Sequence, residues 1–143
     1  FYKSPLFDIG QTKPNENVPW MKSFTSIKDQ LDYKFIFCLE GKCISTNLYW
    51  AMSSNSVCIM PKPKYESWFM EGKLKDGVHY IKVKDDFSDA EEKIEFYINE
   101  NDKCLKIIDN AKKFVKQFKD VKQERLIQLL ILKQYFKSTG QYE

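Results

Sequence analysis

The chain has 143 residues, of which 43% are hydrophobic and 30% are charged. This balance excludes an intrinsically disordered protein, and the length allows one domain with a sizeable core. The formal net charge is only +3, and the lysines are interspersed with acidic residues, so no basic arm indicates a nucleic-acid-binding protein.

Residues 1–30 are predicted to form an irregular lead-in or linker, because proline, glycine and asparagine interrupt every hydrophobic period. A short helix is expected near Ser26, with Ile27 and Leu31 on one face. The interrupting residues are Pro5, Gly10, Pro14, Asn15, Asn17 and Pro19.

Residues 31–143 are predicted to form one domain that begins with alternating strands and helices. The apolar run 35–39 predicts a strand covered on both faces. Ser45 or Thr46 can cap the next helix, whose apolar face would be Leu48, Ala51 and Met52.

A second buried strand is predicted at 57–60, stopped by Pro61 and Pro63. One or two helical turns are expected at 65–70, closed by Gly72, and a third strand at 79–83.

The remaining chain is predicted to be helical. Ser88 and Glu91 have the spacing of a capping box that begins one helix, and a second begins near Asp102. The last helix, at about 121–137, is expected to bury four apolar side chains in the core. These are Leu126, Leu129, Leu130 and Ile131.

Alternating strands and helices are typical of a parallel sheet with helices on its faces. The predicted fold class is therefore α/β, a three-layer Rossmann-like domain with a short parallel sheet and a helical C-terminal tail.

Four cysteines occur, none in a Cys-x-x-Cys pair, and the only histidine, His79, completes no zinc-binding spacing. We expect free thiols, a reducing compartment and no metal site. Asp85, Asp86 and Asp89 are better explained by a loop and a helix N-terminus than by a metal cluster.

Ligands of open parallel sheets bind at the carboxyl ends of the strands, which here precede the loops 40–46, 61–65 and 84–88. In the first loop, Gly41 would allow close approach of a ligand. Ser45, Thr46 and Asn47 would open a helix whose N-terminus favours an anion such as a diphosphate. An ordinary strand-to-helix turn explains the same residues. Dinucleotide-binding, P-loop and nucleophile-elbow motifs are absent.

The order and spacing of several segments resemble glycosyltransferase family 90, and they are closest to its bacterial lipopolysaccharide branch. The resemblance extends from Asp8 to Gln141. It is carried by Tyr33-Lys34-Phe35-Ile36, Leu39-Glu40-Gly41, Ser45-Thr46-Asn47-Leu48-Tyr49-Trp50, Ser54-Asn55-Ser56-Val57, Trp68-Phe69 and His79-Tyr80-Ile81-Lys82-Val83.

This resemblance implies the C-terminal half of a GT-B glycosyltransferase, which binds a nucleotide-sugar, usually a UDP-sugar. We expect a UDP-hexose here. Carried over by position, Gly41, Ser45, Thr46 and Asn47 would face the diphosphate. Animal members have an arginine at Asn47, so Lys42 or Lys62 would have to supply the missing charge, or the helix N-terminus would suffice.

The loop after the second strand would supply Tyr65 and Glu66 to the donor cleft, with Trp68 beside them. The alternative is that Trp68 and Phe69 pack against the sheet while Glu66 is solvated. His79 fits a structural role better than a catalytic one.

The resemblance predicts an enzyme that transfers a hexose to a saccharide or glycolipid acceptor in lipopolysaccharide or lipooligosaccharide assembly. It would need no cofactor, and its catalytic base would belong to an N-terminal domain of the same enzyme. Because the chain starts at Phe1, we expect part of a longer protein that is inactive alone.

No apolar run approaches the ~20 residues of a membrane span and no signal peptide is evident, so we expect a cytoplasmic location with possible peripheral contact at the inner membrane. The rival interpretation is a non-catalytic α/β protein-interaction module, with the last helix as its docking face.

Overall fold

The computed structural model describes residues 1, 3–12 and 18–141. Pro14, Asn15 and Asn17 of the predicted lead-in lie outside the described residues. The predicted short helix near Ser26 is confirmed as α1 (Ile27–Gln30), and Ser26 caps it by accepting a hydrogen bond from the Asp29 N–H.

The sheet has three parallel strands in the order β1-β2-β3, as expected. These are β1 (Phe35–Phe37), β2 (Val57–Met60) and β3 (Ile81–Lys82). β1 and β3 are shorter than predicted, although the hydrogen bonding continues one residue further: Cys38 N–H donates to Ile59 O and Val83 N–H to Met60 O.

Successive residues of a strand point to opposite faces, and here each face has its own core cluster. Cys58 and Met60 of β2 pack into the cluster that includes α2 (Leu48–Met52). Val57 and Ile59 pack into the cluster that includes α3 (Ala90–Asn99). The predicted three layers are therefore confirmed.

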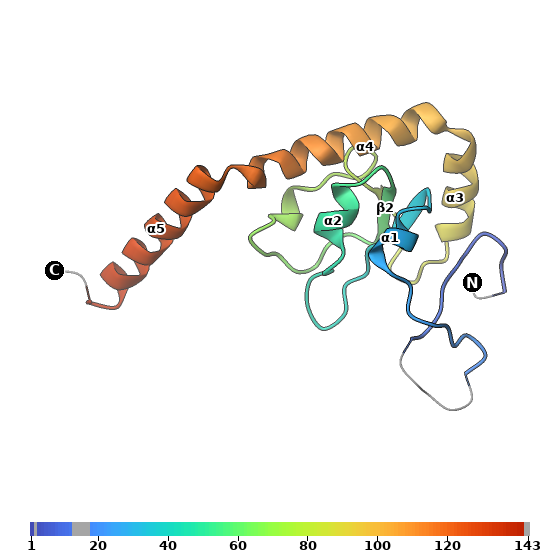
Figure 1. Cartoon of the computed structure of the whole chain (residues 1–143), viewed down its shortest axis with the longest axis horizontal. Helices are drawn as coiled ribbons and strands as arrows, with labels where there is room; N and C mark the ends of the chain where they lie inside the picture. The colour runs from blue at the N-terminus through green and yellow to red at the C-terminus, as the bar shows by residue number, and fades with distance from the viewer. Residues whose placement is uncertain (2, 13–17, 142–143) are drawn as a thin grey trace.

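The long helix α4 (Asn101–Lys116) joins the two clusters (Figure 1). Its buried Cys104 and Ile107 belong to the cluster with α3, whereas Ala111 and Val115 belong to the cluster with α2. The helix thus contributes buried residues to the core on both faces of the sheet.

The helical turns predicted at 65–70 are wrong. The first helical residues come after this segment, in the 3-10 helix η1 (Glu71–Lys73), which contains Gly72, the residue that was expected to end the turns. The Glu71 carboxylate accepts hydrogen bonds from Ser67 N–H and Oγ, and this contact folds the segment into a turn before η1 begins.

The predicted capping box is also wrong. Asp89 occupies the N-cap position of α3, and the Glu91 carboxylate accepts a hydrogen bond from Ser4 Oγ at 2.8 Å. The Glu91 side chain, which the local spacing assigned to capping of the helix, therefore bonds the lead-in instead.

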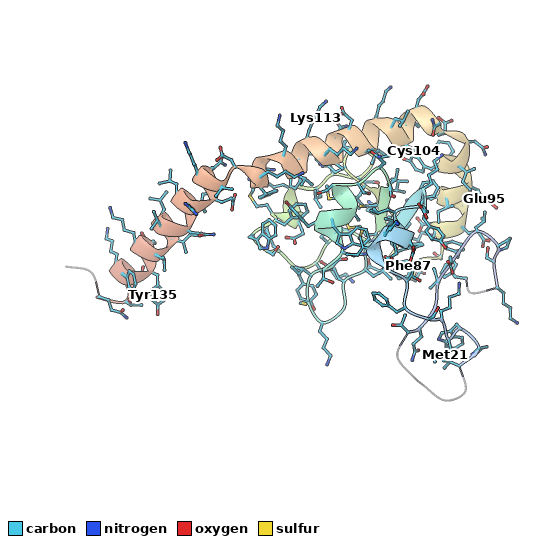
Figure 2. All side chains as sticks on the ribbon, viewed as in Figure 1. Met21, Phe87, Glu95, Cys104, Lys113 and Tyr135 are labelled. Carbon is cyan, nitrogen blue, oxygen red and sulfur yellow. The ribbon has the colours of Figure 1, made fainter. Side chains whose placement is uncertain are left out.

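The last helix departs most from expectation. A 3-10 turn, η2 (Gln117–Lys119), follows α4, and α5 (Val121–Ser138) then projects away from the sheet (Figure 1). α5 has no buried residue, so the predicted burial of its leucines is wrong. Leu126, Leu129, Leu130 and Ile131 are 56–63% exposed, and the side chains of α5 extend into solvent on several sides (Figure 2).

None of the helices in the described parts of the chain combines the length and apolar character needed to cross a membrane.

Candidate functional site

A cleft of about 290 Å³ lies where β1 and β2 end, at the edge of the sheet predicted to bind ligands. The segments that follow all three strands contribute to it. Of the predicted site residues, Gly41, Ser45 and Tyr65 line the cleft, whereas Thr46, Asn47, Lys62 and Glu66 do not.

Ser45 and Asn47 form a hydrogen-bonded link to β1 rather than a helix cap. Ser45 Oγ donates to Asn47 Oδ1 at 2.6 Å, and Asn47 Nδ2 donates to the Phe37 carbonyl at 2.8 Å. Asn47 is at the N-cap position of α2 but makes no capping hydrogen bond, so the predicted cap by Ser45 or Thr46 is wrong. With five residues, α2 is also too short to concentrate much positive potential at its start.

Gly41 is exposed on the wall of the cleft. A Cβ built at this position would meet no atom within 4 Å, so the chain itself does not require a glycine here. The open space beside Gly41 is consistent with the ligand approach that the sequence suggested.

The loop after β2 separates the remaining predicted residues. Lys62 and Glu66 are exposed outside the cleft, and a Glu66 carboxylate oxygen lies 3.2 Å from the Cβ position of Gly72. Trp68 packs in an aromatic cluster, with ring centroids 5.4 Å from Tyr49 and 5.5 Å from Phe118. The alternative that both aromatic residues pack against the sheet holds for Phe69, which is buried in the core cluster with Met60 of β2, but not for Trp68, which stays 61% exposed. Glu66 is exposed, and its contact with a donor stays a prediction.

Glu40 and Lys64 also line the cleft, although the sequence did not single them out. The Glu40 carboxylate accepts hydrogen bonds from the backbone N–H groups of Lys64 and Tyr65, at 3.0 and 3.2 Å. The Lys64 ammonium pairs with Asp85 at 2.8 Å. These contacts join the three strand-end loops, and the only sequence signal for them was that each residue follows a strand.

Glu71 is a third missed residue. It is buried, lines the cleft, and its carboxylate accepts from Ser67 N–H and Oγ, both at 2.7 Å. A buried carboxylate of this kind can accept hydrogen bonds from the hydroxyl groups of a sugar.

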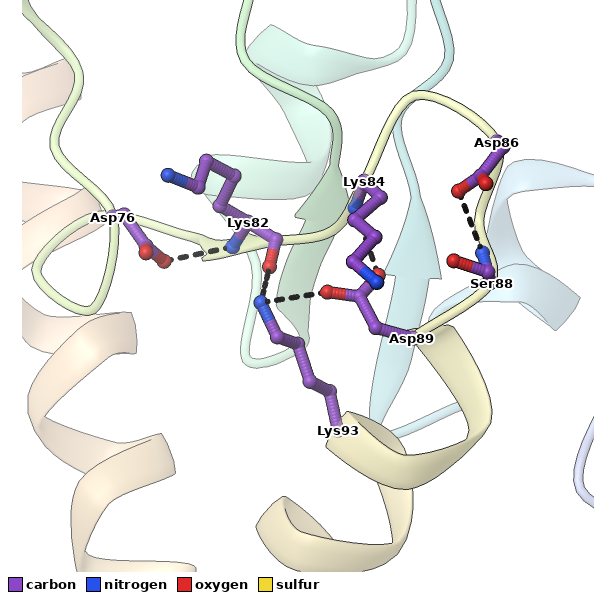
Figure 3. Close-up of polar contacts among 7 residues, drawn as sticks. All are labelled: Asp76, Lys82, Lys84, Asp86, Ser88, Asp89 and Lys93. Atoms are coloured by element: carbon purple, nitrogen blue, oxygen red, sulfur yellow. Dashed lines mark hydrogen bonds and ion pairs between the residues drawn. The ribbon is translucent and has the colours of Figure 1, made fainter.

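The acidic segment after β3 is stabilised by its own backbone (Figure 3). Asp86 accepts from the Ser88 N–H, and hydrogen bonds from Ser88 hold its pKa below the usual value. Burial opposes ionisation of Asp89, but hydrogen bonds from the Lys84 N–H and Lys93 outweigh it and lower the pKa of Asp89. Within the described residues, no cluster of three or more His, Cys, Asp or Glu side chains could hold a metal ion. The loop interpretation of the aspartates fits these contacts.

His79 has the contacts of a structural residue. Its Nδ1 accepts a hydrogen bond from the Lys75 N–H at 3.0 Å, and its ring centroid lies 5.2 Å from that of Phe114. Partial burial, aided by the charge of Lys75, lowers the pKa of His79. Free thiols were expected, and all four cysteines are unpaired, with Cys43 exposed and the others buried.

A larger cavity of about 570 Å³ lies elsewhere, between the lead-in, β1 and α3. Phe7, Asp8, Lys22 and Tyr33 are among the residues that line it, and none of the predicted site residues does. It is not at the carboxyl ends of the strands, so the smaller cleft remains the candidate site.

Comparison with known proteins gives a family and two relatives. The model of glycosyl transferase family 90 matches residues 8–138. The O-glucosyltransferase LpsA of Dichelobacter nodosus is 43% identical over 137 residues, which cover 95% of this chain and 43% of that protein. An uncharacterized protein, 179R, of Invertebrate iridescent virus 6 is 31% identical over 98 residues, covering 64% of this chain and 8% of the viral protein. The chain thus spans less than half the length of both relatives.

Proposed function

The chain belongs to glycosyl transferase family 90, and we propose that it forms the part of a hexosyltransferase that binds the nucleotide-sugar donor. One observation carries the proposal: in an α/β chain of this family, a cleft lies at the carboxyl ends of two parallel strands. This is where parallel sheets of the Rossmann type bind nucleotides.

We propose a UDP-hexose as the donor, with glucose as the first sugar to test because the bacterial relative is named an O-glucosyltransferase. The acceptor is a saccharide or glycolipid of lipopolysaccharide or lipooligosaccharide assembly. We place the reaction in the cytoplasm and propose that it needs no metal ion or other cofactor.

The side chains of the cleft suggest which parts of the donor each of them would contact. Glu71 and Tyr65 offer acceptors and a hydroxyl for sugar or ribose groups, and Gly41 leaves room beside them. The catalytic base for the acceptor hydroxyl belongs, in this proposal, to an N-terminal domain that completes a GT-B enzyme. The chain alone would then bind donor weakly and not turn it over.

The experiment is calorimetric titration of UDP-glucose and other nucleotide-sugars into the wild-type chain and the Gly41→Trp variant. Gly41 lines the cleft, and a Cβ at this position has no protein atom within 4 Å. The tryptophan side chain should therefore obstruct the cleft without unfolding the chain. We expect binding to wild type and its loss in the variant.

Glu92→Trp serves as the matched control, because Glu92 is exposed on α3 and does not line the cleft. Equal binding to wild type and Gly41→Trp would place the donor outside this cleft. Absence of heat with every nucleotide-sugar would refute donor binding by the chain.

The exposed apolar helix α5 favours a second role, protein interaction, and we propose that its partner is the N-terminal domain of the same enzyme. Residues 126–132 are apolar except for Gln128, and a contiguous exposed apolar patch is typical of a surface that binds another protein surface. The bacterial relative extends well beyond the matched segment, so it has chain that could do this.

Protection of α5 amides from hydrogen exchange tests this role. We expect fast exchange in the isolated chain and slow exchange in a protein that also contains the N-terminal domain. Fast amide exchange of α5 in both proteins would refute the proposal that the N-terminal domain covers this helix.

A further inference from the structure

Lys64 has a special position in the candidate cleft. Among the described residues that line it, Lys64 alone carries a positive charge, whereas Glu40, Glu71 and Asp85 carry negative charge. A diphosphate brings further negative charge, so Lys64 is the side chain of the described lining that can offset this charge directly.

The backbone of Lys64 is held in place. Its N–H donates to both oxygens of the Glu40 carboxylate, at 3.0 and 3.2 Å, and the adjacent Tyr65 N–H donates to the same group. Pro61 and Pro63 further restrict the loop. The position from which the Lys64 side chain extends is therefore set before any ligand arrives.

The side chain of Lys64, in contrast, is held only by an exposed ion pair. Its Nζ lies 2.8 Å from Asp85 Oδ2, and both side chains are 63% exposed. Exposed pairs of this kind contribute little free energy and break easily. The hydrogen bond to Asp85 also raises the pKa of Lys64, so the ammonium is charged at neutral pH.

The other two carboxylates of the cleft, Glu40 and Glu71, differ from Asp85 because their hydrogen-bond donors are not lysine side chains. Glu40 accepts backbone N–H groups and Glu71 accepts hydrogen bonds from Ser67, so neither pairs with a lysine side chain in the cleft. Among the carboxylates of the described cleft lining, Asp85 is the one that pairs with an ammonium group.

We propose that Lys64 exchanges partners when the donor binds: its Nζ leaves Asp85 and binds the diphosphate, so that Asp85 acts as a competitor that weakens anion binding. The exchange brings a positive charge to the diphosphate, a role for which the sequence offered Lys42, Lys62 or the N-terminus of the helix after Asn47. This inference rests on the proposed donor-binding function.

The test is calorimetric titration of UDP-glucose, UDP and uridine into wild type, Lys64→Met, Asp85→Asn and the double variant. A charge-assisted hydrogen bond predicts that Lys64→Met weakens binding of both phosphate-containing ligands about tenfold or more. Asp85→Asn should tighten it a few-fold because the competitor is gone. The gain should be smaller when Lys64 is already methionine, because only the direct repulsion between Asp85 and the diphosphate is then removed. Uridine, which has no phosphate, should bind all four proteins equally.

Two controls match these variants. Lys113→Met removes the lysine of another exposed pair, with Asp109 at 2.6 Å, and should leave all affinities unchanged. Lys64→Arg keeps the charge and should retain most of the diphosphate affinity.

The outcomes separate the inference from the function beneath it. If wild type binds UDP-glucose and Lys64→Met binds it equally well, the exchange is refuted while donor binding stands. If Asp85→Asn weakens binding of UDP and uridine alike, the pair is a structural latch between loops and the exchange is refuted. If wild type binds no nucleotide-sugar, the proposed function fails and the inference fails with it.

Discussion

α4 and α5 are consecutive helices of 16 and 18 residues, and both contain many apolar residues, but only α4 is part of the core. In α4 the buried residues recur every three or four positions, at Cys104, Ile107, Ala111 and Val115. This places them on one stripe that a sheet can cover. In α5 the residues 126–132 surround the helix, so a single flat surface could cover only part of them.

The difference shows that the arrangement of apolar residues, rather than their number, determines what a short sheet can bury. The two helices also differ in how they begin. Asp120 caps α5 by accepting hydrogen bonds from Lys122 and Gln123 N–H, whereas the N-cap residue of α4, Glu100, makes no capping hydrogen bond. α4 is therefore stabilised by tertiary burial, and α5 by local interactions.

The largest expected effect comes from placing a charge on the buried stripe. Val115→Asp should lower the free energy of unfolding by ~3–5 kcal/mol, because an unpaired carboxylate would be buried between α4 and the sheet. Leu130→Asp, at the exposed centre of α5, should change it by less than ~0.5 kcal/mol. Urea denaturation followed by tryptophan fluorescence measures both. Equal destabilisation by the two variants would show that α5 packs on the body in solution.

An intermediate effect is expected from removing the cap of α5. Asp120→Ala should destabilise that helix by ~1 kcal/mol, visible as a loss of helical circular dichroism at low temperature. The unfolding midpoint of the body should stay unchanged, because α5 has no buried residue. Glu100→Ala is the matched control and should preserve the helical signal of α4. A fall in the body's midpoint with Asp120→Ala would contradict the separation of the two helices.

The smallest effect concerns pH, through His79 and its contact with Phe114 of α4. The folded state lowers the pKa of His79, so it favours the neutral ring. The contribution is complete above the ordinary histidine pKa of about 6.5 and is lost as pH falls below it, because the unfolded chain takes up the proton first. Urea unfolding between pH 7.5 and 5.5 should show this decline.

His79→Asn provides the control, because its amide oxygen can accept the same hydrogen bond from Lys75 without titrating in this range. The variant should lose the part of the decline between pH 7.5 and 5.5 that His79 causes. An identical decline in both proteins would assign it to other groups.

The candidate site was predictable at the level of loops but not of individual side chains. The strand pattern located the cleft, and Gly41, Ser45 and Tyr65 line it. Asn47 was assigned to a ligand, but its amide bonds the Phe37 carbonyl, since a polar group near a strand end finds a backbone partner first. Glu40 and Lys64 could not be singled out, because their pairing depends on how two loops meet in space.

The sequence by itself determined the three parallel strands, the stripe of α4 and the family, because hydrophobic period and residue order are local properties of the chain. Only the tertiary structure decided that α5 stays exposed and how the charged residues around the cleft pair. Burial requires a surface of matching shape within reach, and the sheet's faces are covered by α2, α3 and α4, so the apolar residues of α5 remain exposed.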